Sequence, residues 1–265
     1  MKKNFVKNFP AVLLMVLSVL AISLRAEASG LFGPLQTVSR EQGGLNTAIG
    51  YLYHEDTYKN GENYKIKQNE IYSQAAYGAK NIWEVYARIG VSNMKIAGIF
   101  ASSDHFVETS QDDFEADWKF FGTLGAKAFY PINEMFGVGA FLQGTYYFSD
   151  FSDHVAITSG GVPVRTEMKF ENLRDAVFGV GLQAKLPCGT NLYAGPYLYY
   201  SEADLSLFSG LYGTEYAEKH YTVKNKSLAG GFAGAEIPLI KGFRLNLEGQ
   251  FADRFSAGAA ISYTY

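Results

Sequence analysis

Hydrophobic and polar residues alternate with a period of two along much of the chain. The pattern is clearest in five segments, which are 83–92, 118–129, 138–148, 178–186 and 243–251. In each segment one set of alternate positions carries no charged residue. Successive side chains of a β-strand point to opposite faces, so the pattern predicts strands with one apolar face. The segment lengths match the roughly 9 to 11 residues that a tilted strand needs to cross a membrane.

The end of the chain shows the same alternation with small residues and aromatics. One face of this segment would carry Ala257, Ala259, Ile261, Tyr263 and Tyr265, and the other would carry Gly258, Ala260, Ser262 and Thr264. An apolar face that ends on aromatic rings suits a strand that contacts lipid, because such rings gather at the membrane boundary. We therefore predict that the last strand is a membrane strand.

The connections between these segments alternate between short and long. Short links recur near residues 80–81, 131–134, 187–191 and 238–242, and proline opens three of them. The long polar links lie near 54–63, 97–115, 149–167 and 202–220. This asymmetry is typical of outer-membrane barrels, in which the short turns are periplasmic and the long loops extracellular.

Further strands near 45–53, 64–80, 192–201 and 222–237 bring the expected number to ten. A closed antiparallel barrel leaves no unpaired edge, which lipid would not tolerate. Two positions disturb the pattern: Pro196 needs a bulge in its strand, and Lys224-Asn225-Lys226 breaks the alternation. If those segments form one misread region, eight strands is the alternative.

The start of the chain has the pattern of a secretory signal peptide. Lys2, Lys3 and Lys7 precede an apolar run from residue 9 to 24, and Ala26-Glu27-Ala28 is a small-x-small cleavage site. We expect a signal peptide over residues 1–28, a periplasmic N-terminal segment over 29–43 and a barrel over 44–265.

Composition and charge exclude several classes of protein. Charged residues make up 18% of the chain, below the roughly 25% of an ordinary soluble domain. Removing the signal's four basic residues and one acidic residue leaves 19 Lys and Arg and 25 Asp and Glu, a net charge of −6. A nucleic-acid partner is therefore not expected. Cys188 is the only cysteine, so the chain forms no intramolecular disulfide.

Charged residues on the inward faces predict a network inside the barrel. Its expected members are Glu84, Arg88, Lys127, Lys185, Glu236, Arg244 and Glu248. Opposite charges in a narrow lumen tend to pair, since each would otherwise be desolvated without compensation. We expect Arg88 and Glu248 to pair near mid-height. Inward-facing aromatic side chains would fill much of the remaining space, because a barrel of eight to ten strands is narrow.

The chain from Leu45 to Tyr265 resembles the small outer-membrane β-barrels of the OmpA, OmpX and opacity type. In that group a terminal aromatic residue with apolar residues at alternate positions before it serves as the assembly signal, which here is Ile261, Tyr263 and Tyr265. The resemblance implies the outer membrane of a Gram-negative-type bacterium, contact with its lipid and lipopolysaccharide, and recognition by the barrel-assembly machinery. In contrast to OmpA, we expect no peptidoglycan-binding domain after the barrel.

Candidate catalytic and metal-binding residues are few. His54, His105, His154 and His220 all fall in or beside the expected extracellular loops. Ten-stranded proteases of the omptin type use loop Asp and His residues, but their pattern of an Asp two residues before a His is not reproduced at Asp104-His105 or Asp153-His154. The histidine spacing offers no zinc site. We expect neither an enzyme nor a cofactor.

The sequence thus predicts an all-β transmembrane barrel with a closed or narrow lumen and a structural or surface-interaction role. A narrow channel for small solutes, with Arg88 and Glu248 at its constriction, is the first alternative. A loop-borne hydrolase of the omptin type is the second. The extracellular partner stays open, since fold does not determine function.

Overall fold

The computed structural model describes residues 31–36, 44–60, 62–79, 82–100, 107–109, 111–159, 162–211, 217–252 and 255–265. The predicted signal peptide, residues 1–28, lies outside the described residues. The strands are β1 (Gly44–Asn60), β2 (Glu62–Ala79), β3 (Trp83–Ile96), β4 (Val107–Thr109), β5 (Phe114–Pro131), β6 (Phe136–Tyr147), β7 (Phe151–Ser159), β8 (Val162–Lys185), β9 (Asn191–Leu211), β10 (Ala217–Asn225), β11 (Ala229–Pro238), β12 (Phe243–Phe251) and β13 (Phe255–Thr264). The described residues include no helix long and apolar enough to span a membrane.

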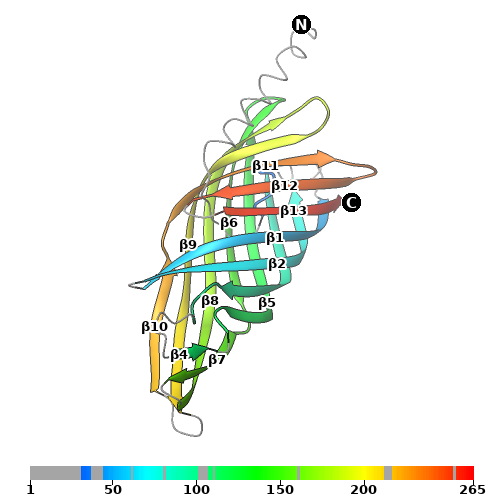
Figure 1. Ribbon diagram of the computed structural model, residues 1–265. Helices are drawn as coiled ribbons and strands as arrows, with labels where there is room; N and C mark the ends of the chain where they lie inside the picture. Colours follow the sequence, from blue (N-terminus) through cyan, green and yellow to red (C-terminus); the bar gives the residue numbers. More distant parts are fainter. Residues whose placement is uncertain are drawn as a thin grey trace.

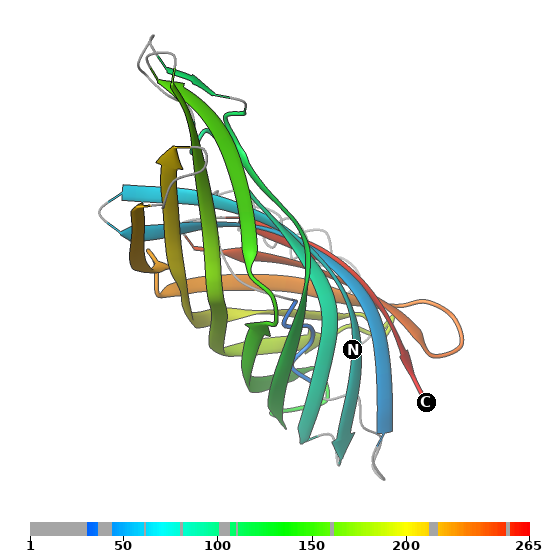
Figure 2. The ribbon, with the colours of Figure 1, turned by 90° about the horizontal axis from the view of Figure 1, so that it is seen from below.

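Ten of the described strands close into a ring (Figures 1 and 2). Their order is β1, β2, β3, β5, β6, β8, β9, β11, β12 and β13, and every neighbouring pair is antiparallel. The last strand returns to the first, with a register that runs from Asn46 opposite Thr264 to His54 opposite Ser256. The ten-stranded antiparallel barrel predicted from the sequence is therefore confirmed.

The outer wall of the ring has the chemistry of a membrane-facing surface. Burial alternates along the strands, so that Leu142 is 57% exposed whereas its neighbours Phe141 and Gln143 are each 2% exposed. Aromatic side chains mark both ends of the apolar band, with Trp83, Tyr130, Phe136, Phe243 and Tyr265 at one end and Tyr51, Trp118, Phe148, Tyr200 and Phe255 at the other. An apolar band between two aromatic girdles is the exterior of an outer-membrane β-barrel.

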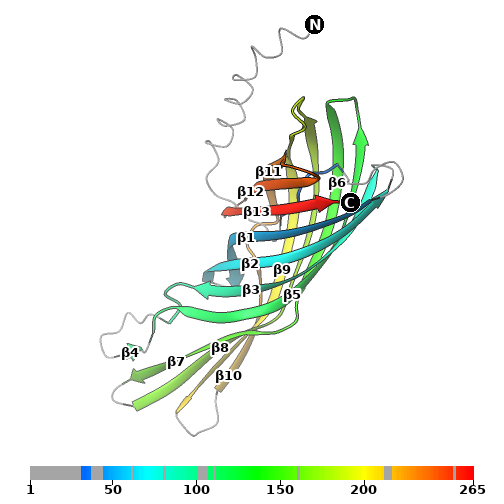
Figure 3. The same cartoon turned by 90° about the vertical axis from the view of Figure 1, so that its right-hand side faces the viewer.

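Three short strands extend the barrel beyond its membrane band. β10 pairs with β9, β7 pairs with β8 and β4 pairs with β7, and all three gather at the lower end in Figures 1 and 3. We call β4, β7, β10 and their partner residues 162–170 and 202–211 the crown. The long links predicted near 149–167 and 202–220 are therefore largely paired strands, and the first, near 54–63, is the end of the β1–β2 hairpin. The prediction of loops at these places was wrong because a tertiary core holds these segments extended.

The two irregular positions have different outcomes. The eighth predicted strand, 222–237, is interrupted after Asn225, so that β10 and β11 are separate strands. Pro196 stays inside β9, and the pairing with β8 passes from Gly179–Tyr197 to Leu182–Ala194 without a change of register. The bulge expected at Pro196 lies instead near Asn172, which has a φ of 54°.

Two clusters of buried side chains fill the interior. One lies within the membrane band and includes Phe32, Phe141 and Phe232. The other contains side chains from β1, β2, β3, β5, β6, β7, β8, β9, β10 and β13 and extends into the crown. Barrels of this width are usually filled by their own strands, but here Leu31, Phe32 and Leu35 of the segment before β1 belong to the clusters as well.

Candidate functional site: the plugged lumen

Residues 31–36, which we call the plug, lie inside the barrel. Leu31, Phe32 and Leu35 are at most 1% exposed, and the segment is visible within the ring of strands in Figure 2. The prediction that residues 29–43 form a periplasmic segment is therefore wrong for the plug, while residues 29–30 and 37–43 lie outside the described residues. The physical reason is that Leu31, Phe32 and Leu35 are apolar, and the removal of their side chains from water lowers the free energy of the protein.

The Glu248 carboxylate on β12 holds two successive backbone groups of the plug. The N–H of Phe32 donates to Oε1 and the N–H of Gly33 donates to Oε2, each at 2.8 Å. The Tyr193 hydroxyl at 3.0 Å and the Gln250 Nε2 at 2.6 Å also donate to this carboxylate. A buried carboxylate is costly unless donors surround it, and four donors do so here.

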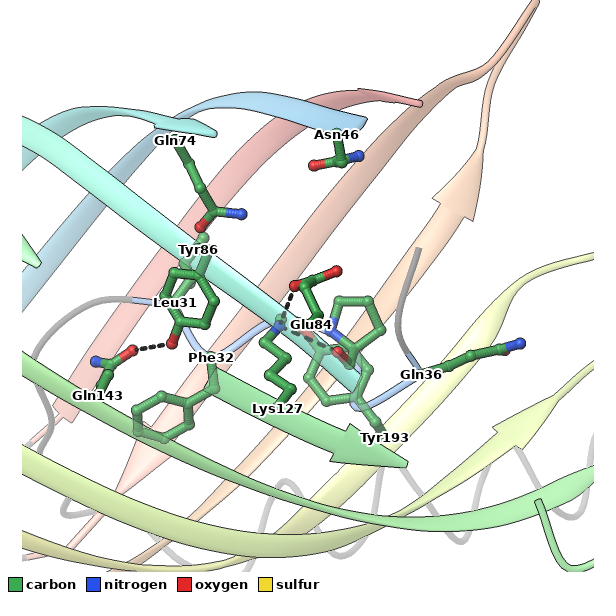
Figure 4. A network of polar contacts seen from close by, with 12 residues as sticks. Leu31, Phe32, Gln36, Asn46, Gln74, Glu84, Tyr86, Lys127, Gln143 and Tyr193 are labelled. Atoms are coloured by element: carbon green, nitrogen blue, oxygen red, sulfur yellow. Dashed lines mark hydrogen bonds and ion pairs between the residues drawn. The ribbon is translucent and has the colours of Figure 1, made fainter. Parts of the chain in front are cut away.

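Two cations on the opposite wall bind the carbonyl groups of the plug. Arg88 Nη2 donates to the carbonyl oxygen of Leu31, and its Nε donates to Gln74 Oε1 at 2.6 Å. Lys127 Nζ donates to the carbonyl oxygen of Pro34 at 3.1 Å and lies 3.9 Å from Glu84 (Figure 4). The plug backbone is therefore held on one side by a carboxylate and on the other by cations.

The side chains of the plug fit apolar space provided by the strands. The Phe32 ring centroid lies 4.3 Å from that of Phe141, 5.2 Å from that of Phe232 and 5.3 Å from that of Tyr197. Leu35 packs against Gly139 and Gly181, where a Cβ atom would come within 2.8 and 2.9 Å of its side chain. Glycine at these two positions makes room for the plug.

Gly33 is the one plug residue with a left-handed backbone, at a φ of 71°. A Cβ atom there would lie 3.1 Å from Lys127 Nζ and 3.2 Å from Asn246 Nδ2. Glycine adopts this conformation without the steric cost that other residues incur. The turn at Gly33 allows the Phe32 and Gly33 amides to converge on a single carboxylate.

The structure places the seven predicted network residues as follows. Glu84, Arg88, Lys127, Glu236 and Glu248 are buried and face inward as predicted. Arg244 Nη1 donates to Glu236 Oε1 at 2.6 Å, which is a pair between β12 and β11.

Two details of the predicted network are wrong. Arg88 and Glu248 do not bind each other, because the plug lies between them and takes the hydrogen bonds of both. Lys185 is exposed, because it is the last residue of β8 and reaches water at the mouth of the barrel.

A second group of buried side chains fills the interior toward the crown and includes residues of the crown itself. We call it the outer seal, and its large buried side chains include Tyr58, Phe114, Phe151, Phe170 and Leu205. A space beside the plug, lined by Leu31, Phe32 and Gly33 among others, measures about 40 Å³. Such a volume holds a few water molecules, since one water needs roughly 10 to 15 Å³ by the same measure.

Buried polar groups of the outer seal form hydrogen bonds with one another. Tyr147 donates to Glu70 Oε1 at 2.7 Å, His54 Nε2 lies 2.9 Å from Gln68 Oε1, and Tyr199 donates to Asp56 Oδ2 at 3.0 Å. The expectation that His54 lies in or beside an extracellular loop is wrong, because it belongs to β1 and faces the lumen with 1% exposure. His105 lies outside the described residues.

A serine, a histidine and an acidic side chain lie together at the edge of the crown. Ser206 Oγ donates to Glu171 Oε2 at 2.8 Å and lies 2.8 Å from His220 Nδ1. In a catalytic triad the acid orients the histidine, whereas here both groups meet on the serine, which is 0% exposed. Among the described residues no cluster of three or more His, Cys, Asp or Glu could hold a metal ion.

Sequence reasoning missed the residues that define the plug site. Phe32, Gly33, Gln183 and Tyr193 were not singled out, although Gln183 Oε1 accepts a hydrogen bond from the Gln36 N–H at 2.9 Å. One signal was present: the run Leu31-Phe32-Gly33-Pro34-Leu35 is apolar in a segment expected to lie in water.

No family model matches the chain, and no curated protein matches it. Among solved structures, the chain is similar to the translocator domain of the autotransporter NalP from Neisseria meningitidis, at 9% identity and a TM-score of 0.43 over 84% of this chain and 88% of that one. It is similar to the outer membrane protease OmpT from Escherichia coli at 12% identity and a TM-score of 0.43, over 84% and 95% of the two chains. It is also similar to an outer membrane channel from Pseudomonas putida F1 at 14% identity and a TM-score of 0.42, over 90% and 100%. These barrels differ in role, so the function of this chain is argued from its own geometry.

Proposed function

We propose that this protein is a non-conducting outer-membrane barrel whose crown serves as a surface for contacts outside the cell. The observation that supports the proposal is that buried side chains fill the lumen at two levels, at the plug and at the outer seal. A space of about 40 Å³ beside the plug is too small for a solute larger than a few waters.

The crown supports the second half of the proposal because its strands share the buried cluster of the outer seal. Phe151, Phe170 and Leu205 are each at most 1% exposed, so β7, β8 and β9 pack on one another beyond the membrane band. A packed core makes a segment rigid, and a rigid surface binds with a smaller loss of conformational entropy than flexible loops do.

Charge pairs fix the base of the crown. Glu202 binds Arg174 Nη2 at 2.6 Å and Lys224 Nζ at 3.1 Å. Hydrogen bonds from Tyr200, Arg174 and Lys224 lower the pKa of Glu202 to about 2. The carboxylate therefore stays ionised at neutral and mildly acidic pH.

Planar-bilayer recording tests the proposal. We expect no conductance steps from the full chain, with a known porin as the positive control. A variant that lacks residues 31–36 should also stay closed, because the large side chains named for the outer seal all belong to strands of the barrel and crown. Steady conductance of the unmodified protein would contradict the proposal and would favour a narrow channel for small solutes instead.

A further inference from the structure

The inner half of the lumen has the contact pattern of a peptide-binding site. Three charged side chains bind backbone groups of the plug: Glu248 takes two N–H groups, Arg88 takes the carbonyl of Leu31 and Lys127 takes that of Pro34. Backbone contacts of this kind do not depend on the side chains of the bound segment. They would hold any peptide that enters in the same direction and conformation.

Two further features select the sequence of the bound peptide. The space between Phe141, Phe232 and Tyr197 is filled by an aromatic ring. The next position, Gly33, has a left-handed backbone. A Cβ atom at this position would lie 3.1 Å from Lys127 Nζ. The site therefore favours an aromatic residue followed directly by glycine.

The plug does not belong to the sheet. Its residues have no strand pairing, and its hydrogen bonds go to side chains of β3, β5, β8 and β12. Departure of the plug would thus break no backbone ladder of the barrel. A transmembrane barrel keeps its closed sheet when such a segment leaves, since the sheet satisfies its own backbone groups.

The plug also leaves part of the site unused. Arg88 is 6% exposed and its Nη1 has no hydrogen-bond partner. This residue lines the space of about 40 Å³ together with Gln74, Asn46 and Lys127. A second space of about 170 Å³ lies at the mouth, between Gln36, Gln183 and the turn at Asn133–Met135. This second space extends the site beyond the last plug residue.

We infer that the inner half of the lumen is a binding site for extended peptides that carry an aromatic residue directly before glycine, and that residues 31–36 are its tethered ligand. The inference concerns the end of the barrel with the short turns. It does not depend on the role proposed for the crown.

The test uses the full chain without residues 31–36, refolded in lipid, and the labelled synthetic peptide Leu-Phe-Gly-Pro-Leu-Gln. We expect saturable binding by fluorescence anisotropy. Replacing the peptide's phenylalanine by alanine should weaken binding roughly 100-fold, because a buried ring is lost. Glu248→Gln in the plug-free chain should also weaken binding, whereas the control Glu115→Gln, at an exposed position of β5 away from the inner half of the lumen, should not. A folded plug-free chain that binds neither peptide, or both equally, would overturn the inference.

A second measurement covers the case in which the plug-free chain does not fold. In the full chain, Cys188→Ser removes the only natural thiol, and Leu35→Cys then places a single thiol on the plug. Free peptide at millimolar concentration, the range of effective concentration for a short tether, should displace the plug and speed maleimide labelling of that thiol. The alanine peptide is the control. Equal labelling rates with and without peptide would overturn the inference.

Discussion

The Phe32→Ala variant should destabilise the barrel although residue 32 lies outside every strand. The ring is 0% exposed and contacts Phe141, Tyr197 and Phe232. Truncation of a buried phenylalanine to alanine costs about 3 to 5 kcal/mol, since it removes apolar contacts and leaves a cavity. If the plug of the variant left the lumen and no cavity formed, Arg88, Lys127 and Glu248 would lose their backbone partners.

Urea unfolding in lipid vesicles measures this loss. Trp83 and Trp118 are the two tryptophans, and both lie on the outer wall at 42% and 46% exposure, so their fluorescence reports departure from lipid. With a denaturant slope of at most about 3 kcal/mol/M, a loss of 3 kcal/mol lowers the midpoint by about 1 M or more.

Gln36→Ala is the matched control within the plug. It removes one side-chain hydrogen bond, from Gln183 Nε2 at 3.2 Å, and should cost about 1 kcal/mol. An unchanged midpoint for Phe32→Ala, or equal shifts for the two variants, would refute the packing of Phe32 in the lumen.

Two further predictions concern the membrane wall and the last strand. Leu142→Arg places a charge on β6 midway between the two aromatic girdles and should lower the free energy of unfolding by about 2 to 4 kcal/mol. Tyr146→Arg, near the membrane boundary, should lower it by about 0 to 1 kcal/mol in the same unfolding assay. Equal losses would mean that the membrane band is misplaced. Deletion of residues 262–265 removes the end of the β13–β1 pairing, including the Tyr265 N–H bond to Leu45 at 3.1 Å, and should leave exported protein that is absent from outer-membrane fractions. Tyr265→Phe should insert normally, and normal recovery of the truncated chain would exclude the assembly signal.

The barrel wall was predictable because its signal is local. Alternation along 138–148 places Leu142 outward and Gln143 inward whatever the partner strands are, and the structure has both as predicted. The short turns and the number of membrane strands followed from the same period and from the prolines that end strands. The same alternation was sufficient to predict that Glu84, Arg88 and Glu248 face inward.

The crown was not predictable at the same level. Segments 149–167 and 202–220 mix charged residues with apolar ones, which is compatible with a loop or with an extended hairpin. The choice between a loop and a hairpin is decided by a core that forms between segments far apart in sequence. In this core the ring centroids of Phe114 and Phe170 lie 5.7 Å apart. Such contacts leave no periodic signal in either segment alone.

The plug was missed for a related reason. Charged residues in the lumen were expected to satisfy one another, because only the strands were considered as partners. Glu248 and Arg88 instead bind backbone groups at Leu31, Phe32 and Gly33, and every residue except proline offers both a backbone donor and an acceptor. Sequence alone cannot show which backbone groups will be the partners.

Hydrogen exchange of the plug tests its position most directly. Mass spectrometry of fragments that cover residues 31–36, from the unmodified protein in lipid, reports the amides of Phe32, Gly33 and Gln36, which are bound by Glu248 and Gln183. We predict exchange orders of magnitude slower than in an unfolded peptide, because these amides are hydrogen-bonded and buried. Exchange of this segment at the unfolded rate, while the strands stay protected, would contradict a lumen closed by residues 31–36.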